Sequence, residues 1–281
     1  MFGHQYYHQV LRKYVISFGN LFNDIIVQRF NKSGTRIQAI AVPIAYGPKE
    51  KFLARINADP TLSRDVAIQL PRIGFEMTGM TYDATRKLNK TQQNRAVGPN
   101  TNLLRSQFMS APYNLEFTLS IFVKNADDGV QILEQILPFF TPEFTPTVNL
   151  LPTMGFTVDS PVILNSVQME DSYEGDFDTR RALVYTLNFT MKGYILGPVT
   201  TSGVIKRVQV DAYSDLNTSA REERVVLTPG LLANGSPTTN STASVATGLI
   251  SANSDFGIAE DFFFFTDGRT YNASSGSDSN E

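Results

Sequence analysis

Two histidines near the start of the chain have the spacing of a helical metal site. His4 and His8 are four residues apart, so on a helix their imidazole rings would lie on one face. The residues between them lack the glutamate of the His-Glu-x-x-His zinc motif, and no third ligand is evident. The chain has no other histidine, and a Gly-x-Ser-x-Gly elbow is also missing. We therefore predict surface histidines, and neither a metal nor a cofactor.

An acidic turn is the second place where the residue types could bind a metal. It spans residues 170–181 and contains Glu170, Asp171, Glu174, Asp176, Asp178, Arg180 and Arg181. Clustered carboxylates can bind Ca²⁺, but the spacing lacks the twelve-residue loop with its closing glutamate. We therefore favour a charged loop that faces solvent or a neighbouring subunit.

Motifs for other reactions are missing from the sequence. The chain has no cysteine, which excludes a disulfide framework, a thiolate metal site and a cysteine nucleophile. Neither the phosphate loop GxxxxGK[ST] nor the dinucleotide fingerprint GxGxxG occurs. The triplet Asp255-Phe256-Gly257 matches one kinase motif but has none of the companion motifs. These observations predict that the protein is not an enzyme.

The composition is that of an ordinary folded protein without a strong charge. Hydrophobic residues make up 42% of the 281 residues, and the formal net charge is -3. A dedicated nucleic-acid-binding protein would usually carry a basic excess on one face. No apolar run has the length of a signal peptide or a membrane span. We expect a soluble protein that contacts no membrane and assembles in a reducing cytoplasm.

The middle of the chain contains the clearest structural signal, a strand followed by a helix. Apolar and polar residues alternate over 113–123, which predicts a strand with one buried face. Asn125 can cap a helix over 126–137, and Asp127 and Asp128 place negative charge at the positive end of its dipole. The predicted buried stripe of this helix is Val130, Leu133, Ile136 and Leu137.

The remaining segments up to residue 215 predict strands, two short helices and one irregular crossing. The predicted elements are a helix over 5–22, a hairpin of 25–30 and 37–45 around Gly34, a helix over 48–56, a strand over 66–82 with a bulge at Pro71, a proline-rich crossing over 139–161, and strands over 162–170, 181–194 and 204–213. We predict an α+β fold, in which a mixed, mainly antiparallel sheet packs against the helices at 5–22 and 126–137.

A long polar connection over residues 83–107 is a candidate binding loop. Its positive side chains are Arg86, Lys87, Lys90, Arg95 and Arg105, and Asp83 is its only acid. A solvated loop is the simpler interpretation. However, connections of this length without secondary structure are uncommon in compact domains and often bind partners.

Both ends of the chain carry aromatic residues that need a partner. Phe2, Tyr6 and Arg12 either cap their own domain or contact a neighbouring subunit. Residues 216–281 are rich in Ser, Thr, Asn and Gly, which predicts an extension that is flexible or ordered by partners. Within it, Phe262, Phe263, Phe264 and Phe265 should dock on the chain's own core or on another subunit.

Five stretches, taken in this order, resemble one family of phage proteins. They are SFGNLFNDIIVQR, VPIAYGPKEKF, LPRIGFEM with TYDATRKLN, PYNLEFTLSIFVKNADDGVQILEQILPFFTPEF, and DTRRALVYTLNFTMKGYILGP. The family is that of the tail sheath stabiliser and completion proteins of T4-like contractile-tailed bacteriophages. The resemblance covers residues 1–215, is most specific over 119–144 and ends near residue 216.

The resemblance implies a role in the virion. Such a protein forms a ring of six copies at the head-proximal end of the tail, closes the tube and sheath, and stabilises the extended sheath. Its implied partners are other copies of itself, the tail sheath protein, the tail tube terminator and the neck proteins of the head, with DNA only passing through the lumen. The charged loops over 83–107 and 170–181 are the expected contact surfaces. The alternatives are a tail tube terminator, a head-to-tail connector adaptor, or an unrecognised hydrolase.

Overall fold

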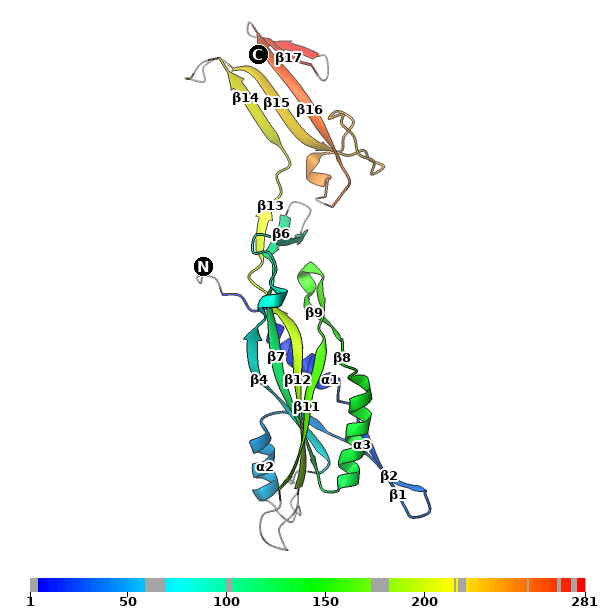
Figure 1. Cartoon of the computed structure of the whole chain (residues 1–281). Coiled ribbons are helices and arrows are strands. Elements are labelled where there is room, and N and C mark those ends of the chain that lie inside the picture. Colours follow the sequence, from blue (N-terminus) through cyan, green and yellow to red (C-terminus); the bar gives the residue numbers. More distant parts are fainter. Residues whose placement is uncertain are drawn as a thin grey trace. The chain divides into compact units, whose positions relative to one another are not determined.

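A computed structural model of the chain shows two compact units (Figure 1). Unit 1 comprises Met1–Gln92 and Met109–Gly197, and unit 2 comprises Gln93–Phe108 and Pro198–Glu281. The structure describes residues 5–58, 69–99, 103–172, 182–214, 216, 221–251, 253–266, 269–273 and 277–280. Each unit has its own sheets, and each is described by itself below.

Unit 1 is built on a six-stranded sheet. The strand order is β3-β4-β7-β12-β11-β8, and every neighbouring pair is antiparallel except β3 and β4. The strands are β3 (Ile44–Tyr46), β4 (Arg72–Tyr82), β7 (Ala111–Val123), β12 (Ala182–Ile195), β11 (Val162–Ser172) and β8 (Glu143–Phe144). β7 and β12 run side by side along their whole length, from the pair Ala111–Ile195 to the pair Val123–Leu183. The predicted strands at 113–123, 162–170 and 181–194 are confirmed.

One face of this sheet is apolar because the side chains of β7 alternate. Leu115, Phe117, Leu119 and Ile121 are buried on it. The helix α1 (Val10–Asn20) lies on the same face, where the Phe18 ring stacks 4.3 Å from the Phe117 ring. The Tyr14 hydroxyl accepts a 2.8 Å hydrogen bond from the Tyr194 backbone N–H. These contacts attach α1 to the two central strands.

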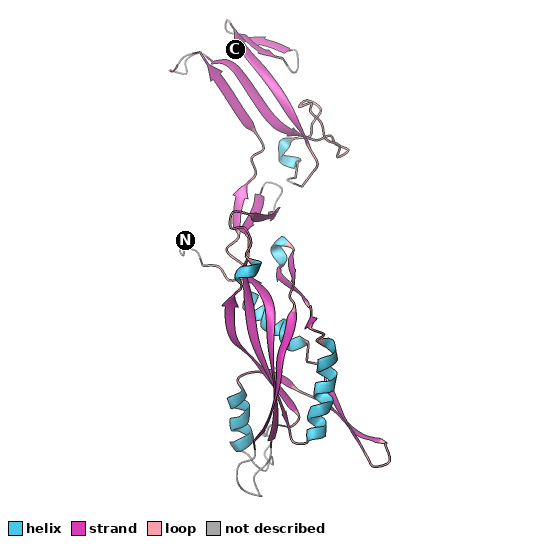
Figure 2. Cartoon of the chain, in the orientation of Figure 1, coloured by secondary structure: helices cyan, strands magenta, loops and turns pink. Residues whose placement is uncertain are grey.

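Among the described elements, one helix packs at one end of the other face. The helix α2 (Lys49–Ala58) packs there, with Phe52 and Ile56 buried against Phe122 and Val184. Helices therefore lie on both sides of the sheet at the end of β7, as Figure 2 shows. This explains why Ile121, Phe122 and Val123 are all buried although their side chains alternate in direction.

The first predicted helix is shorter than expected. α1 begins at Val10, because Gln9 has a left-handed backbone with φ of 56° and cannot continue a helix toward residue 5. His8 therefore precedes the helix, so the expected pair of histidines on one helical face is wrong. The His8 Nε2 atom instead lies 2.9 Å from the backbone oxygen of Gly197, and His4 lies outside the described residues.

The helix α3 (Ala126–Ile136) confirms the predicted position but not the predicted stripe. Its buried side is formed by Asp128, Gly129, Ile132, Leu133 and Ile136. Val130 and Leu137 are exposed, because the stripe is rotated toward Tyr185, whose ring approaches Gly129 closely. Asn125 holds the N-cap position with an extended backbone, but its side chain makes no capping hydrogen bond.

Three further predictions for unit 1 need correction. The second hairpin strand is divided by Pro43 into β2 (Arg36–Ala41) and β3, while Gly34 has the expected positive φ of 78°. The bulge in β4 lies between Met77 and Gly79 and not at Pro71. The crossing over 139–161 is not irregular throughout, since it contains β8 and a hairpin of β9 (Thr147–Leu151) and β10 (Phe156–Asp159).

Unit 2 consists of strands, and β14 confirms the later part of the strand predicted over 204–213. Elsewhere in this unit the sequence predicted a loop and a partner-dependent extension. β5 (Gln93–Val97), β6 (Leu103–Phe108) and β13 (Thr200–Gly203) form a three-stranded sheet. The strands β14 (Val208–Tyr213), β15 (Arg221–Gly230), β16 (Gly257–Thr266), β17 (Arg269–Asn272) and β18 (Ser277–Asn280) form a five-stranded sheet. The low apolar content of residues 233–254 concealed the alternating strands on either side. The chain as a whole is mostly β, with the expected mixed and antiparallel sheets.

Candidate interaction surfaces

A two-stranded arm projects from unit 1 (Figure 1). It consists of β1 (Ile26–Phe30) and β2, which within the described part of the chain pair only with each other. At its tip, Phe30 is 55% exposed and Ile37 is 69% exposed. An isolated two-stranded ribbon is marginally stable in water, so the arm depends on what holds its base.

The base of the arm is held by α3. The Gln135 side chain accepts from the Ile26 N–H at 3.3 Å and donates to the Ile26 carbonyl at 2.8 Å, in the manner of a neighbouring strand. Gln131 accepts from the Gln28 N–H at 3.0 Å. These contacts saturate backbone groups on the edge of β1 that would otherwise need water or another strand.

An ion pair fixes the same base. The Arg29 guanidinium donates two hydrogen bonds to the Asp128 carboxylate, the shorter at 2.6 Å. The Asp128 side chain is only 3% exposed, and the carboxylate raises the pKa of Arg29 further through this hydrogen bond. A buried carboxylate needs such a partner, so the arm leaves α3 at a defined place.

The five-stranded sheet of unit 2 has an open apolar face. Residues that pair across strands share a face, and the pairs Val208–Leu227, Val210–Val225, Pro229–Ile258 and Phe264–Tyr271 lie on this one. Val210 and Ile258 are each 57% exposed. Across the paired positions of β14, β15 and β16, the charged residues on this face are Glu223 and Glu260. We call this surface the open face.

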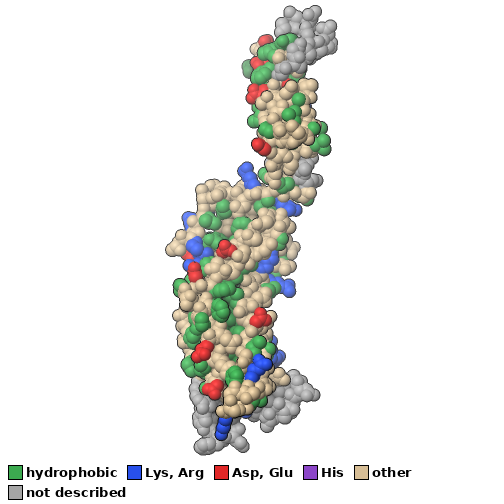
Figure 3. Space-filling view, turned by 90° about the vertical axis from the view of Figure 1, so that its right-hand side faces the viewer, with side chains coloured by type: hydrophobic (Ala, Val, Ile, Leu, Met, Phe, Trp, Pro, Cys, Tyr) green, Lys and Arg blue, Asp and Glu red, His purple; other side chains and the backbone are tan. Residues whose placement is uncertain are grey.

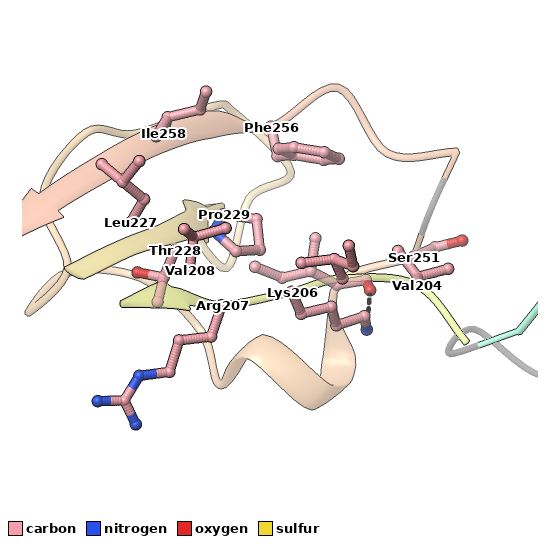
Figure 4. A pocket seen from close by; sticks show the side chains of 12 residues that line it. Val204, Lys206, Arg207, Val208, Leu227, Thr228, Pro229, Ser251, Phe256 and Ile258 are labelled. Atoms are coloured by element: carbon pink, nitrogen blue, oxygen red, sulfur yellow. Dashed lines mark hydrogen bonds between the residues drawn. The ribbon is translucent and has the colours of Figure 1, made fainter. Parts of the chain in front are cut away.

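The open face borders a small apolar pocket (Figure 4). This pocket of about 260 Å³ is lined in part by Leu227, Pro229, Phe256 and Ile258. At its edge, the Lys206 ammonium donates a hydrogen bond to the Ile250 carbonyl at 2.6 Å. This bond ties the segment between β15 and β16 to the residues before β14. Figure 4 shows the Arg207 side chain directed away from Phe256 and Ile258. The pocket therefore extends the apolar character of the open face.

The opposite face of this sheet carries arginines. Arg207, Arg221 and Arg224 line a pocket of about 540 Å³ together with Phe265. The Arg221 guanidinium lies 3.9 Å from the centre of the Phe265 ring. Arg224 donates to the Asp211 carboxylate at 2.5 Å and thereby lowers the pKa of Asp211 to about 2. The pairing with Asp211 uses part of this positive charge internally.

The sequence of the chain matches proteins of contractile phage tails. The sequence profile of the tail sheath stabiliser of T4-like viruses of the Myoviridae matches residues 5–249. The chain belongs to this family. It is 33% identical over 226 residues to the tail completion protein gp15 of Enterobacteria phage T4, which covers 76% of this chain and 80% of that protein. The family match continues beyond residue 215 to residue 249 and therefore includes β15 of unit 2.

The basic side chains predicted for this tail sheath stabiliser lie in two units. Lys87 and Lys90 are exposed in unit 1. Arg86 is engaged internally, with hydrogen bonds to Asp83 and Asn114. The hydrogen bond from the Thr85 hydroxyl and, next, the one from Arg86 hold the pKa of Asp83 well below its usual range. In unit 2, Arg95 on β5 is exposed and Arg105 on β6 is partly buried.

Those two arginines do not form one patch. Arg95 pairs with Ser106, and Arg105 pairs with Ala96 and Thr201, so the two side chains lie on opposite faces of the three-stranded sheet. On the face of the molecule shown in Figure 3, positive and negative side chains are interspersed with apolar ones. The residues predicted as a single basic loop are therefore separated by the strands that carry them.

The predicted acidic and aromatic residues have different positions. Asp127 is exposed at the start of α3, whereas Asp128 is buried against Arg29. The predicted contact residues Glu174, Asp176, Asp178, Arg180 and Arg181 lie outside the described residues, as does Phe2. Tyr6 and Arg12 are exposed. Phe262, Phe263, Phe264 and Phe265 lie on β16, where side chains alternate between the two faces.

The sequence predicted the hairpin that forms the arm, but it did not predict that this hairpin projects from unit 1, nor the open face, nor the ion pair at the base of the arm. The alternation Val208, Val210 and Val225, Leu227 was a detectable signal for a sheet with an apolar face. Nothing in the sequence indicated that Arg29 would meet Asp128. Among the described residues, no cluster of His, Asp and Glu could hold a metal, and no helix is long and apolar enough to cross a membrane.

Proposed function

We propose that this tail sheath stabiliser acts as a ring of six copies at the head-proximal end of a contractile tail. In this position it completes the tail, stabilises the extended sheath and offers the attachment surface for the neck of the head. The proposal places the protein in the neck region of the virion, after assembly in the host cytoplasm. DNA passes through the lumen without being read.

The observation that carries the proposal is exposed apolar surface in both units. Phe30 and Ile37 on the arm, and Val210 and Ile258 on the open face, are large apolar side chains left in water. Such surface usually marks a contact with another protein. Head-to-tail contacts that close by rotation bury the same two patches in every copy of a ring.

The relative's name supports the same role. The tail completion protein of phage T4 aligns with most of this chain. We infer that this chain also completes a tail, with the tail sheath protein, the tail tube terminator and the neck proteins as its partners. Its proposed action is adhesion between subunits, without a chemical reaction.

A phage that lacks the protein provides the test. Electron micrographs should show filled heads and separate tails, with sheaths that contract or come apart. The same phage grown in host cells that carry the gene on a plasmid should again give joined particles. Joined heads and tails with extended sheaths in the absence of the protein would contradict the proposal.

A further inference from the structure

We propose that the β1–β2 arm of one copy docks on the open face of unit 2 of the next copy. The inference rests on the proposed ring and specifies which surfaces would form it. The occupant of the open face is then a second copy of this chain.

The arm is suited to reach another molecule because its base is fixed and its tip is apolar. Hydrogen bonds from Gln131 and Gln135 and the Arg29–Asp128 ion pair hold the base. The tip presents Phe30 and Ile37, which α3 does not cover. A preorganised arm loses little conformational entropy on docking, which favours association.

The charges of the two surfaces are complementary. Beyond the paired Arg29, the arm carries Lys32 and Arg36, and the sequence has no acidic residue between Asp24 and Glu50. The open face carries the Glu223 carboxylate among apolar side chains. Apolar contact in the centre with opposite charges around it is the usual composition of a specific protein interface.

The dimensions of the two surfaces are also compatible. Because α3 holds Ile26, Gln28 and Arg29, the free tip comprises residues 30–37, and each side of it extends roughly 10–13 Å at about 3.3 Å per residue. Strands in a sheet lie about 4.8 Å apart, so this tip can cover about three neighbouring strands of the open face.

The two surfaces are different patches, which determines the kind of assembly. A contact between unlike patches is heterologous, and it leaves one arm and one open face free at the ends of any incomplete array. Closure into a ring buries both in every copy. A closed two-fold dimer would instead require the two arms to be exchanged reciprocally.

Cysteine cross-linking tests the contact, because the chain has no cysteine of its own. Ile37→Cys and Val210→Cys are made separately in the full chain and mixed under mild oxidation. We expect a covalent dimer that requires both variants, and a ladder of multimers from the double variant. Gln209→Cys is the matched control for the open face, since this exposed neighbour points to the opposite side of β14.

Charge reversal gives an independent readout. Arg36→Glu and Glu223→Lys should each weaken self-association measured by sedimentation, and the double variant should recover part of the loss. Val210→Lys should abolish the multimer, whereas Gln209→Lys should leave it intact. Circular dichroism spectra that match the unaltered protein show that each variant is folded.

The outcomes separate the contact from the proposed function. A ring that forms without cross-linking and survives Val210→Lys overturns the contact and leaves the ring. A cross-link formed only within single chains of the double variant means that the arm docks on its own chain, which also overturns the contact. A protein that stays monomeric even with sheath protein overturns the ring and the contact together.

Discussion

The two units bury their sheets to different extents. In unit 1, α1 and α3 cover one face of the six-stranded sheet, and α2 covers the end of the other. In unit 2, Val226 and Ala259 are buried on one face of the five-stranded sheet, while Val210 and Ile258 on the other are exposed. Unit 1 thus contains most of the apolar contacts that its fold needs. Unit 2 retains an apolar surface that a partner can cover.

This difference separates the two tasks of a tail sheath stabiliser. A self-sufficient core supplies a rigid body, and exposed apolar surface supplies adhesion once other subunits are present. We therefore expect substitutions in the core of unit 1 to lower stability at every protein concentration. Substitutions on the open face should act mainly on assembly.

Phe18→Ala should have the largest effect on the stability of unit 1. The Phe18 ring contacts the rings of Phe117, Phe75 and Phe189 and is fully buried. Loss of such a side chain costs about 3–5 kcal/mol in the free energy of unfolding. Denaturant unfolding followed by circular dichroism measures the change. Ile16→Ala, on the exposed side of the same helix, is the control, and equal losses in the two variants would refute this account of the core.

Arg29→Ala should have the next largest effect. It leaves the Asp128 carboxylate buried without its cation, which costs about 3 kcal/mol because Arg29 itself is partly exposed. Hydrogen exchange should show faster opening of β1 and β2 in particular. Asp127→Asn, beside the buried acid but exposed, should change stability by less than about 0.5 kcal/mol. Unchanged exchange in the arm would show that the ion pair does not hold its base.

Gly129→Ala tests the packing of α3 on the sheet. Alanine normally stabilises a helix relative to glycine by about 1 kcal/mol. Here its methyl group would overlap the buried Tyr185 ring, so a net loss of about 1–2 kcal/mol is expected. Gly248→Ala, where a methyl group meets no atom within 4 Å, is the control, and thermal unfolding compares the two. A more stable Gly129→Ala variant would mean that α3 lies farther from β12.

The smallest expected effect is the pH dependence of the Arg224–Asp211 pair in unit 2. The Arg224 hydrogen bonds lower the pKa of Asp211 from 3.8 to about 2. The pair therefore stabilises the fold above pH 3.8, and this contribution is lost as the pH falls toward 2. Hydrogen exchange of β14 and β15 between pH 5 and 2.5 would detect the loss. Asp211→Asn should show a flatter dependence over that interval, and an identical profile would exclude the pair as its cause.

Much of unit 1 could be predicted because its strands and helices are amphipathic. The alternation over 113–123 and the Pro48 start of α2 are local signals that the fold preserves. The rotated stripe of α3 was not predictable, since it depends on Tyr185 meeting Gly129 from a strand more than fifty residues away. Tertiary contacts of this kind override local periodicity.

Unit 2 was harder to predict because its signals are weaker. Residues 93–108 are mainly polar and contain the paired strands β5 and β6. The third strand of their sheet, β13, lies almost a hundred residues later in the chain. Residues 233–254 have the composition of a flexible segment, although Ile250 within them is buried. The contact residues predicted from the sequence were chosen mainly by charge, and charge patterns identify loops. The arm and the open face are defined by which apolar side chains remain uncovered, which depends on the fold.

The mass of the purified full-length chain in solution tests the central claim most directly. Light scattering over a range of concentrations should approach six times the chain mass of 31.2 kDa for the unaltered protein. The Val210→Lys variant should remain near 31.2 kDa with an unchanged circular dichroism spectrum. An unaltered protein that stays at the single-chain mass at the highest concentration, and also with tail sheath protein added, would contradict the account.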